Sequence, residues 1–292
     1  MEKYISAYTG AEIDSAIGNV ADHEIRITTL EDKIQYIVES WADVQEIVRR
    51  GLAPTVFRVG DQLVATYNGT EIVWDIIGIN HDTPTDTEKT HSLTIQAHDC
   101  IMNCEWDAEE PTNPDANRQD YGNNRYIHSN IKQWLNSEEA SFNWVSQHAY
   151  DEPSTASPYD GPGFLYNLDP DLKAVIGAVD KQVAQATIDG GGQDTFSDKV
   201  FLLSRVEVYG GDEGVVTGES PYEFYENLAS APESGDLDGR IKYLSGSPRS
   251  WWLRSPYTGD SRLARNVSTT GGISYGNSAF GGFGLAPACC II

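Results

Sequence analysis

The side chains that could bind a metal or act as nucleophiles are scattered along this chain of 292 residues. His98 lies two residues before Cys100, and Cys104 follows four residues after Cys100, which weakly indicates a metal site. Because no second cysteine or histidine pair stands at ligand spacing, we expect buried thiols instead. Cys289 and Cys290 are adjacent, so we expect their side chains to point to opposite faces of the last strand.

Enzyme motifs are equally weak. The six histidines show no evident pairing with a serine or cysteine nucleophile and an orienting carboxylate, although a triad assembled in space stays open. The sequence lacks a phosphate-binding glycine loop, a zinc-protease helix and a dinucleotide fingerprint. We therefore predict no enzyme activity, no catalytic residues, no metal ligands and no cofactor. A structural calcium ion is an open alternative on carboxylates that lack regular ligand spacing: Asp169, Asp171, Asp236 and Asp238.

Charge and hydropathy narrow the range of partners. The net charge is -24, from 44 acidic and 20 basic residues, and the acids are spread along the chain. This charge favours solubility and makes nucleic acid a poor partner. No stretch approaches 18 apolar residues, so we expect no membrane insertion. Residues 1–6 lack an apolar signal core and a cleavage site, which predicts folding in a cytoplasm.

Residues 9–38 are predicted to form a helix with the heptad seam of a coiled coil. Thr9 and Glu12 match a capping box, and apolar residues then recur at alternating spacings of three and four. The segment from Arg26 to Glu31 resembles the trimerisation motif of short coiled coils, in which the arginine pairs with a glutamate of the neighbouring chain. The alternative is an amphipathic helix that docks on its own domain. We assign trimerisation, within a first domain of residues 1–39, to Ile13, Val20, His23, Arg26, Ile27, Leu30, Glu31, Ile34 and Ile37.

Residues 40–292 are predicted to form one mixed α+β domain. Ser40 and Asp43 match a capping box for a helix over 41–50, and Asn68-Gly69 predicts a hairpin turn. We expect further strands and helices between loops at 105–124 and 149–164 and an acidic, glycine-rich insertion at 210–247. The expected strands are 55–59, 62–67, 71–79, 91–97 and 199–209; the expected helices are 127–135 and one that starts at Asp169-Pro170 and buries Leu172, Val175, Ile176 and Val179.

In the C-terminal segment, two apolar stretches flank a stretch that is rich in small and polar residues. Residues 251–253 and 285–292 have the apolar content of buried strands, whereas 257–283 is rich in glycine, polar and aromatic residues. A rigid frame around a tolerant segment is typical of binding sites, and tyrosine and arginine supply much of the energy at interfaces. The alternative is an ordinary glycine-rich loop with Phe280 and Phe283 facing the core. We assign ligand binding to Tyr257, Asp260, Arg262, Leu263, Arg265, Asn266, Tyr275, Asn277, Phe280 and Phe283.

This C-terminal block resembles the same region of C-type-lectin-fold proteins at the ends of gut-phage fibres, many of which are the variable proteins of diversity-generating retroelements. The resemblance is carried by Trp251-Trp252-Leu253-Arg254-Ser255-Pro256, Ser261, Val267, Gly271, Ala279 and Gly284-Leu285-Ala286-Pro287, with further matches at 41–60, 80–82 and 201–204. In that family an error-prone reverse transcriptase rewrites adenine-containing codons, so surface positions vary while the frame stays constant. The resemblance implies a C-type-lectin-like head over residues 40–292, with a variable region near 250–290.

The resemblance also implies a function. It points to a homotrimeric receptor-binding adhesin of a phage or prophage tail fibre that recognises a bacterial surface protein or glycan. Residues 8–14 resemble the start of phage structural proteins, which implies attachment to such a protein through the N-terminus. The chain would then be made in the bacterial cytoplasm and end in the virion.

Three further readings concern the same fold. Calcium-dependent sugar binding is unsupported, because Glu110-Pro111-Thr112 only partly matches the Glu-Pro-Asn motif of animal lectins and no Trp-Asn-Asp follows. A fibre component without diversification and without a receptor is one alternative. A metal-dependent enzyme of the formylglycine-generating type is the other, and its cysteine pair could correspond only to Cys289 and Cys290.

Overall fold

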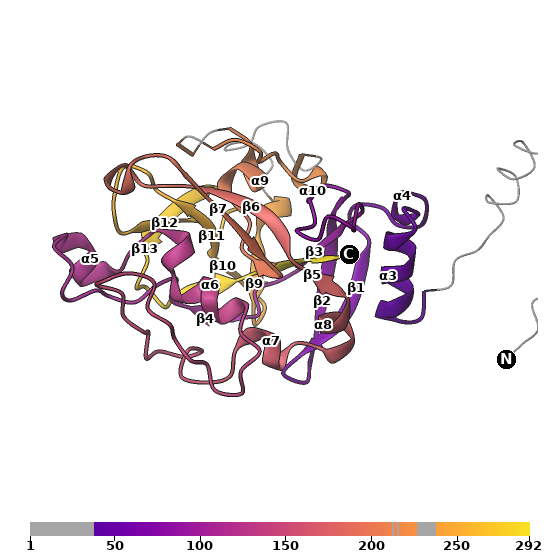
Figure 1. The fold of residues 1–292 in the computed structure, drawn as a ribbon, viewed down its shortest axis with the longest axis horizontal. Coiled ribbons are helices and arrows are strands. Elements are labelled where there is room, and N and C mark those ends of the chain that lie inside the picture. Colours follow the sequence, from indigo (N-terminus) through magenta and orange to yellow (C-terminus); the bar gives the residue numbers. More distant parts are fainter. Residues whose placement is uncertain (1–37, 212, 215, 227–237) are drawn as a thin grey trace, which may run out of the picture. The chain divides into compact units, whose positions relative to one another are not determined.

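The computed structural model describes residues 38–211, 213–214, 216–226 and 238–292. Residues Ser40–Ile292 form one compact unit of α+β class, as the sequence predicts (Figure 1). The predicted coiled coil and all nine residues to which we assign trimerisation lie outside the described residues. Across the part of the chain that the structure describes, no helix has the length and apolar content needed to cross a membrane.

An antiparallel sheet contains strands from near both ends of this unit. The strand order is β1-β2-β3-β15-β5, and β8 also pairs with β15. The predicted hairpin is confirmed, because Asn68 and Gly69 have φ values of 48° and 75° and connect Tyr67 with its partner Thr70. The strands are β1 Gln62–Tyr67, β2 Thr70–Ile79, β3 Leu93–Ala97, β5 Ile176–Gly177, β8 Val200–Phe201 and β15 Ala288–Ile291.

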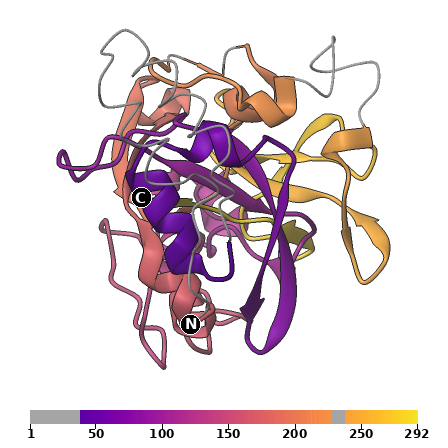
Figure 2. The same cartoon turned by 90° about the vertical axis from the view of Figure 1, so that its right-hand side faces the viewer.

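Helix α3 (Trp41–Arg49) lies beside this sheet at one end of the unit (Figures 1 and 2). The Ser40 side chain accepts the Asp43 N–H, which confirms the predicted cap, and the helix buries the apolar face expected from the sequence. The Gln45 side chain donates to the carbonyl of Ile292 at 2.9 Å, so α3 is hydrogen-bonded to the residue that follows β15. The prediction of a strand at 55–59 is wrong, because a short helix, α4 (Ala53–Val56), with Pro54 in its first turn, occupies part of this range.

The C-terminal frame builds a second sheet with the order β13-β12-β11-β14-β4. Strand β11 carries the two tryptophans of the frame, and all six of its residues are buried. It pairs antiparallel with β12 and parallel with β14, so the segment between the frame strands forms hairpins. The strands are β4 Met102–Cys104, β11 Trp251–Pro256, β12 Leu263–Val267, β13 Ile273–Asn277 and β14 Phe283–Leu285.

The remaining elements are short. Segment 105–124 is not wholly a loop, because Asp115 caps a helix, α5. A strand is predicted over 199–209, but the observed strand ends at Phe201. Ser204 then caps helix α9 with a capping box. The helix predicted after Asp169 is confirmed but ends at Val175. Ile176 and Val179, which were expected on its buried face, are buried in strands β5 and β6 instead. These elements are α5 Ala116–Tyr121, η1 Tyr126–His128, α6 Asn130–Leu135, α7 Phe164–Asn167, α8 Pro170–Val175, β6 Val179–Ala184, η2 Thr187–Asp189, β7 Gln193–Asp198, α9 Arg205–Tyr209, α10 Glu223–Glu226, η3 Asp238–Arg240, β9 Lys242–Leu244 and β10 Ser247–Arg249.

A buried network of charges connects the two sheets. Arg254 of β11 donates to Glu207 of α9, and Lys181 of β6 donates to Glu207 at 2.8 Å and also to Asp82. The thiol of Cys290 on β15 donates to Asp82 at 3.2 Å, which brings the first sheet into the same network. Removing a single member would leave a buried charge without its partner.

Candidate functional site

The predicted binding segment presents one face of β12 and β13 to the outside. Antiparallel pairing places Arg265 opposite Tyr275 and Leu263 opposite Asn277. Side chains on a strand alternate between the two faces of a sheet, so these four share one face. Tyr275 is 51 % exposed, and the other three are partly buried.

Three of these side chains form a compact cluster. The rings of Tyr257 and Tyr275 lie 5.0 Å apart, centroid to centroid, and the Arg265 guanidinium lies 4.6 Å from the Tyr257 ring. Glu213, which is buried, accepts two hydrogen bonds from Arg265 at 2.7 Å and 3.2 Å. The carboxylate compensates the charge of the arginine and fixes the orientation of its guanidinium beside the Tyr257 ring.

A second part of the face comes from α5. The Arg262 guanidinium lies 4.6 Å from the ring of Tyr121, and its Nη1 donates to the Asn117 side chain at 3.0 Å. Sequence reasoning placed Tyr121 and Asn117 in a loop and missed them. Asp115 followed by helix-compatible residues is the capping signal that could have predicted α5.

Phe280 and Phe283 have different roles. Phe283 packs on the buried ring of Trp252, with centroids 4.6 Å apart, while Phe280 contacts Phe283 at 5.0 Å and remains 49 % exposed. Phe283 therefore connects the exposed Phe280 to the buried Trp252 of the frame. The Cβ position of Gly276 faces the ring of Phe283, so Phe283, with Phe280 packed on it, lies on the side of β13 opposite to Tyr275. We call the surface around both sides of β12 and β13 that is formed by Tyr121, Tyr257, Arg262, Arg265, Tyr275 and Phe280 the display face.

One predicted binding residue is misplaced. Asn266 is 1 % exposed, because its side chain points to the side of β12 opposite to that of Arg265. Its amide nitrogen has no hydrogen-bond partner among the described residues. The assignment of Asn266 to the surface is therefore wrong. Asp260, Leu263 and Asn277 are partly buried beside the display face.

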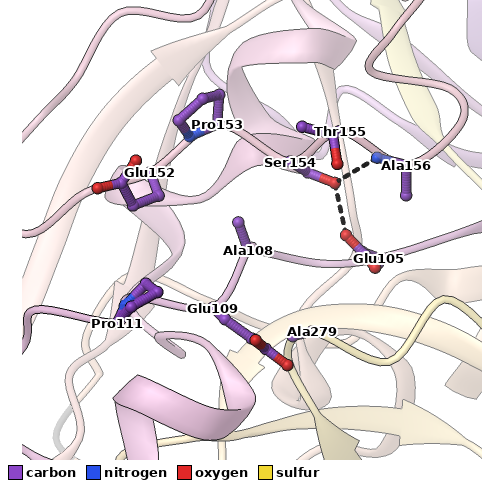
Figure 3. Close-up of a pocket in the computed structure, with 10 residues that line it drawn as sticks. All are labelled: Glu105, Ala108, Glu109, Pro111, Glu152, Pro153, Ser154, Thr155, Ala156 and Ala279. Carbon is purple, nitrogen blue, oxygen red and sulfur yellow. Dashed lines mark hydrogen bonds between the residues drawn. The ribbon is translucent and has the colours of Figure 1, made fainter.

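A pocket of about 590 Å³ lies next to Ala279, at the edge of the binding segment (Figure 3). Segments 105–111 and 152–156 line most of it, and the Ser154 hydroxyl donates to Glu105 at 2.5 Å. Burial raises the pKa of Glu105. With Glu109 and Glu152 also in the lining, the pocket suits groups that donate hydrogen bonds, such as hydroxyls.

A histidine cluster lies in a second pocket of about 500 Å³. His148 Nε2 is 3.0 Å from Glu110 Oε1 and 3.8 Å from Asp151 Oδ1. The hydrogen bond to Glu110 raises the pKa of His148, and burial raises the pKa of Asp151 to about 6. The ring of His128 lies 4.7 Å from that of His148, centroid to centroid, at an interplanar angle of 41°. Burial, together with the charges of Arg125 and His148, lowers the pKa of His128 to about 4.

Sequence reasoning did not bring these side chains together. Glu110 was noted only for its partial match to a lectin motif, and His148 was counted among unpaired histidines. The spacing of three residues between His148 and Asp151 is the local signal that could have drawn attention to them. Glu110 joins them only through the tertiary fold.

The cysteines are buried in the core, and one of the carboxylates considered for calcium caps a helix. All four thiols are buried and free, as predicted for Cys100 and Cys104, and burial raises the pKa of Cys100 to about 12. Neither Cys289 nor Cys290 reaches the surface. Asp169 is the cap of α8 and accepts the N–H groups of residues 171 and 172. Asp236 lies outside the described residues.

The fold and this surface define an α+β protein with a rigid two-sheet frame, an aromatic face and two neighbouring pockets. The chain belongs to the family described as "Domain of unknown function (DUF6273)", which matches residues 93–292. The match runs from β3 to the end of the chain, so it includes the display face and the histidine cluster. No curated protein and no solved structure matches the chain.

Proposed function

We propose that this protein is the receptor-binding adhesin of a phage or prophage tail fibre and that its display face contacts a bacterial surface protein or glycan. The observation that carries the proposal is the contrast between the exposed Tyr275 and Phe280 and the fully buried Trp251 and Trp252 of β11 in the same sheet. Exposed tyrosine, phenylalanine and arginine on a rigid support are typical of binding surfaces.

The topology supports a C-type-lectin-like head. The last strand, β15, returns to pair with β3, while the hairpins of the second sheet are formed by the chain just before it. Residues 251–256, 284 and 285, which carry much of the family resemblance, form buried parts of β11 and β14 in that second sheet. Variation at the display face would leave this frame unchanged, which is what diversification by a retroelement requires.

The positions of the elements suit an adhesin. In Figure 1, α3 lies at one end of the unit, and α5, β12 and β13 lie at the opposite end. A chain attached through its N-terminal segment would therefore point its display face away from α3. In the proposed homotrimer, three weak sites act together and gain affinity through effective concentration.

Sequencing the DNA around the gene tests whether the display face is diversified by a retroelement. We expect a second, near-identical copy of the codons for 250–292, beside a reverse transcriptase gene, differing mainly where that copy has adenine. The differing codons should include those of Tyr257, Arg262, Arg265, Tyr275 and Phe280, the members of the display face that lie within 250–292. Absence of such a copy would leave an adhesin of fixed specificity, and variation confined to buried frame codons would contradict the proposed division.

The adhesin half is tested with fluorescently labelled full-length protein on a panel of gut bacterial strains. We expect binding to a subset of strains, and loss of binding in the Tyr275→Ala, Phe280→Ala double variant without loss of stability. Tyr166→Ala is the matched control, because Tyr166 on α7 is 50 % exposed and lies outside the display face. Failure to bind any strain would favour a structural fibre component.

A further inference from the structure

The cluster of Glu110, His148 and Asp151 has the composition of a metal site. Each residue offers one ligand atom, and these three atoms lie within 4.8 Å of one another. The side chains of Glu110 and Asp151 are each 1 % exposed, and that of His148 is 21 % exposed. Two buried carboxylates therefore face one imidazole whose outer edge reaches the 500 Å³ pocket.

One oxygen of this cluster lacks a partner. Asp151 Oδ2 accepts the Gln147 N–H at 2.6 Å, but Asp151 Oδ1 is buried and has no hydrogen-bond partner among the described residues. Its distance of 3.8 Å from His148 Nε2 is too long for a hydrogen bond. An unsatisfied buried carboxylate oxygen is costly, so an atom that binds it would offset that cost.

The surrounding hydrogen bonds hold the other ligand in place. Asn123 Nδ2 donates to Glu110 Oε1 at 3.1 Å, and Asn113 Nδ2 donates to Glu110 Oε2. Such bonds orient ligands and are typical of metal sites. The arginines that line the pocket are neutralised, because Arg118 pairs with Asp189 and Arg125 pairs with Asp194.

We propose that His148 Nε2, Glu110 Oε1 and Asp151 Oδ1 bind one divalent transition-metal ion, with zinc as the ion that best matches the ligand set. An imidazole nitrogen disfavours calcium and magnesium, which prefer oxygen ligands alone. Ligand atoms around tetrahedral zinc are about 3.3 Å apart at bond lengths of about 2.0 Å, close to the 3.0 Å and 3.8 Å found here. The fourth position faces the pocket and is open to water or to a ligand group.

The site borders the binding segment. A neighbouring pocket of about 380 Å³ is lined by residues 258–261, and it shares Asp115 and Ile188 with the histidine pocket. The pocket that His148 lines therefore adjoins the pocket beside the loop between β11 and β12. The inference does not depend on the proposed adhesin function, because it rests only on the geometry of the three ligands and the unpartnered oxygen.

The test measures zinc binding by the full chain without a histidine tag, after removal of metal with a chelator. Isothermal titration and elemental analysis should give one zinc per chain. His148→Ala and the isosteric Asp151→Asn should each weaken binding at least about 100-fold, and millimolar calcium should not displace the zinc. His98→Ala is the matched control, because His98 lies 2.9 Å from Asp75 and belongs to no group of three ligand residues within the part of the chain that the structure describes.

Three outcomes would contradict the proposed zinc site. No zinc bound by the wild-type chain, or equal binding by the wild type and both cluster variants, would overturn the site. One zinc per three chains, lost in His23→Gln, would assign the metal to the N-terminal segment instead. Circular dichroism and melting of the metal-free Asp151→Asn variant separate loss of the ligand from loss of the fold.

Discussion

Arg254 donates two hydrogen bonds to the carboxylate of Glu207, at 2.6 Å and 2.9 Å, and both side chains are shielded from solvent. Arg254 also donates to Glu219, and Lys181 supplies a second cation to Glu207. The arginine of the Trp-Trp-Leu-Arg block is therefore part of the frame and not of the display face.

Replacing Arg254 should destabilise the unit severely. The Arg254→Ala variant leaves the carboxylates of Glu207 and Glu219 buried with less compensation, and we expect a loss of about 3–5 kcal/mol in the free energy of unfolding. Urea denaturation followed by circular dichroism measures this loss. Arg58→Ala, at an exposed position, should change stability by less than about 0.5 kcal/mol. Equal effects of the two substitutions would contradict a structural role for Arg254.

The same network predicts a loss of stability in acid. Burial alone would raise the pKa of Glu207, but the charges of Arg254 and Lys181 outweigh it and hold this pKa below its ordinary value of 4.5. Because the folded-state pKa is depressed, the stabilisation is fully present above the unfolded-state pKa and is lost as the pH falls towards the folded-state value. Asp82, whose pKa is also lowered, adds to the effect.

This pH dependence can be isolated with one variant. Glu207→Gln cannot titrate, so the difference in unfolding free energy between it and the wild type should be largest near pH 7 and should narrow below about pH 4.5. Buried carboxyls with raised pKa values, such as Asp107, are common to both proteins and cancel. A difference that stays constant from pH 7 to pH 3 would refute the assignment.

The frame and the display face should respond differently to truncation. Trp252 is fully buried and donates its indole N–H to the carbonyl of Cys104 at 2.9 Å. Trp252→Ala should therefore cost about 3–5 kcal/mol. Tyr275→Ala removes an exposed ring and should cost less than about 1 kcal/mol. Comparable losses in melting temperature would show that the two groups of residues are not distinct.

The predicted trimer is tested on the full chain. Ile27→Asp places a charge in the apolar seam, and we expect it to convert a trimer into a monomer in sedimentation equilibrium. Gly18→Ala, on the outer face of the predicted helix, should leave the trimer intact. A wild-type chain that sediments as a monomer would rule out the coiled-coil trimer.

The sequence alone determined the local features of this fold. Capping by Ser40, the turn at Asn68-Gly69 and the buried strand from Trp251 are set by residues that are neighbours along the chain. Such features depend on backbone preferences and on periodicity, both of which act over a few residues. The fold class and most of the strands of the first sheet followed from them.

Other features needed the tertiary structure. Whether Asn266 faced outward depended on the phase of β12 against the core, which a glycine-rich segment does not specify. Tyr121 joined the display face because α5 packs near Arg262, and Glu110 met His148 because two loops converge. Polar side chains carry no periodic signal, and contacts between distant segments are decided only when the apolar core positions the elements that hold them.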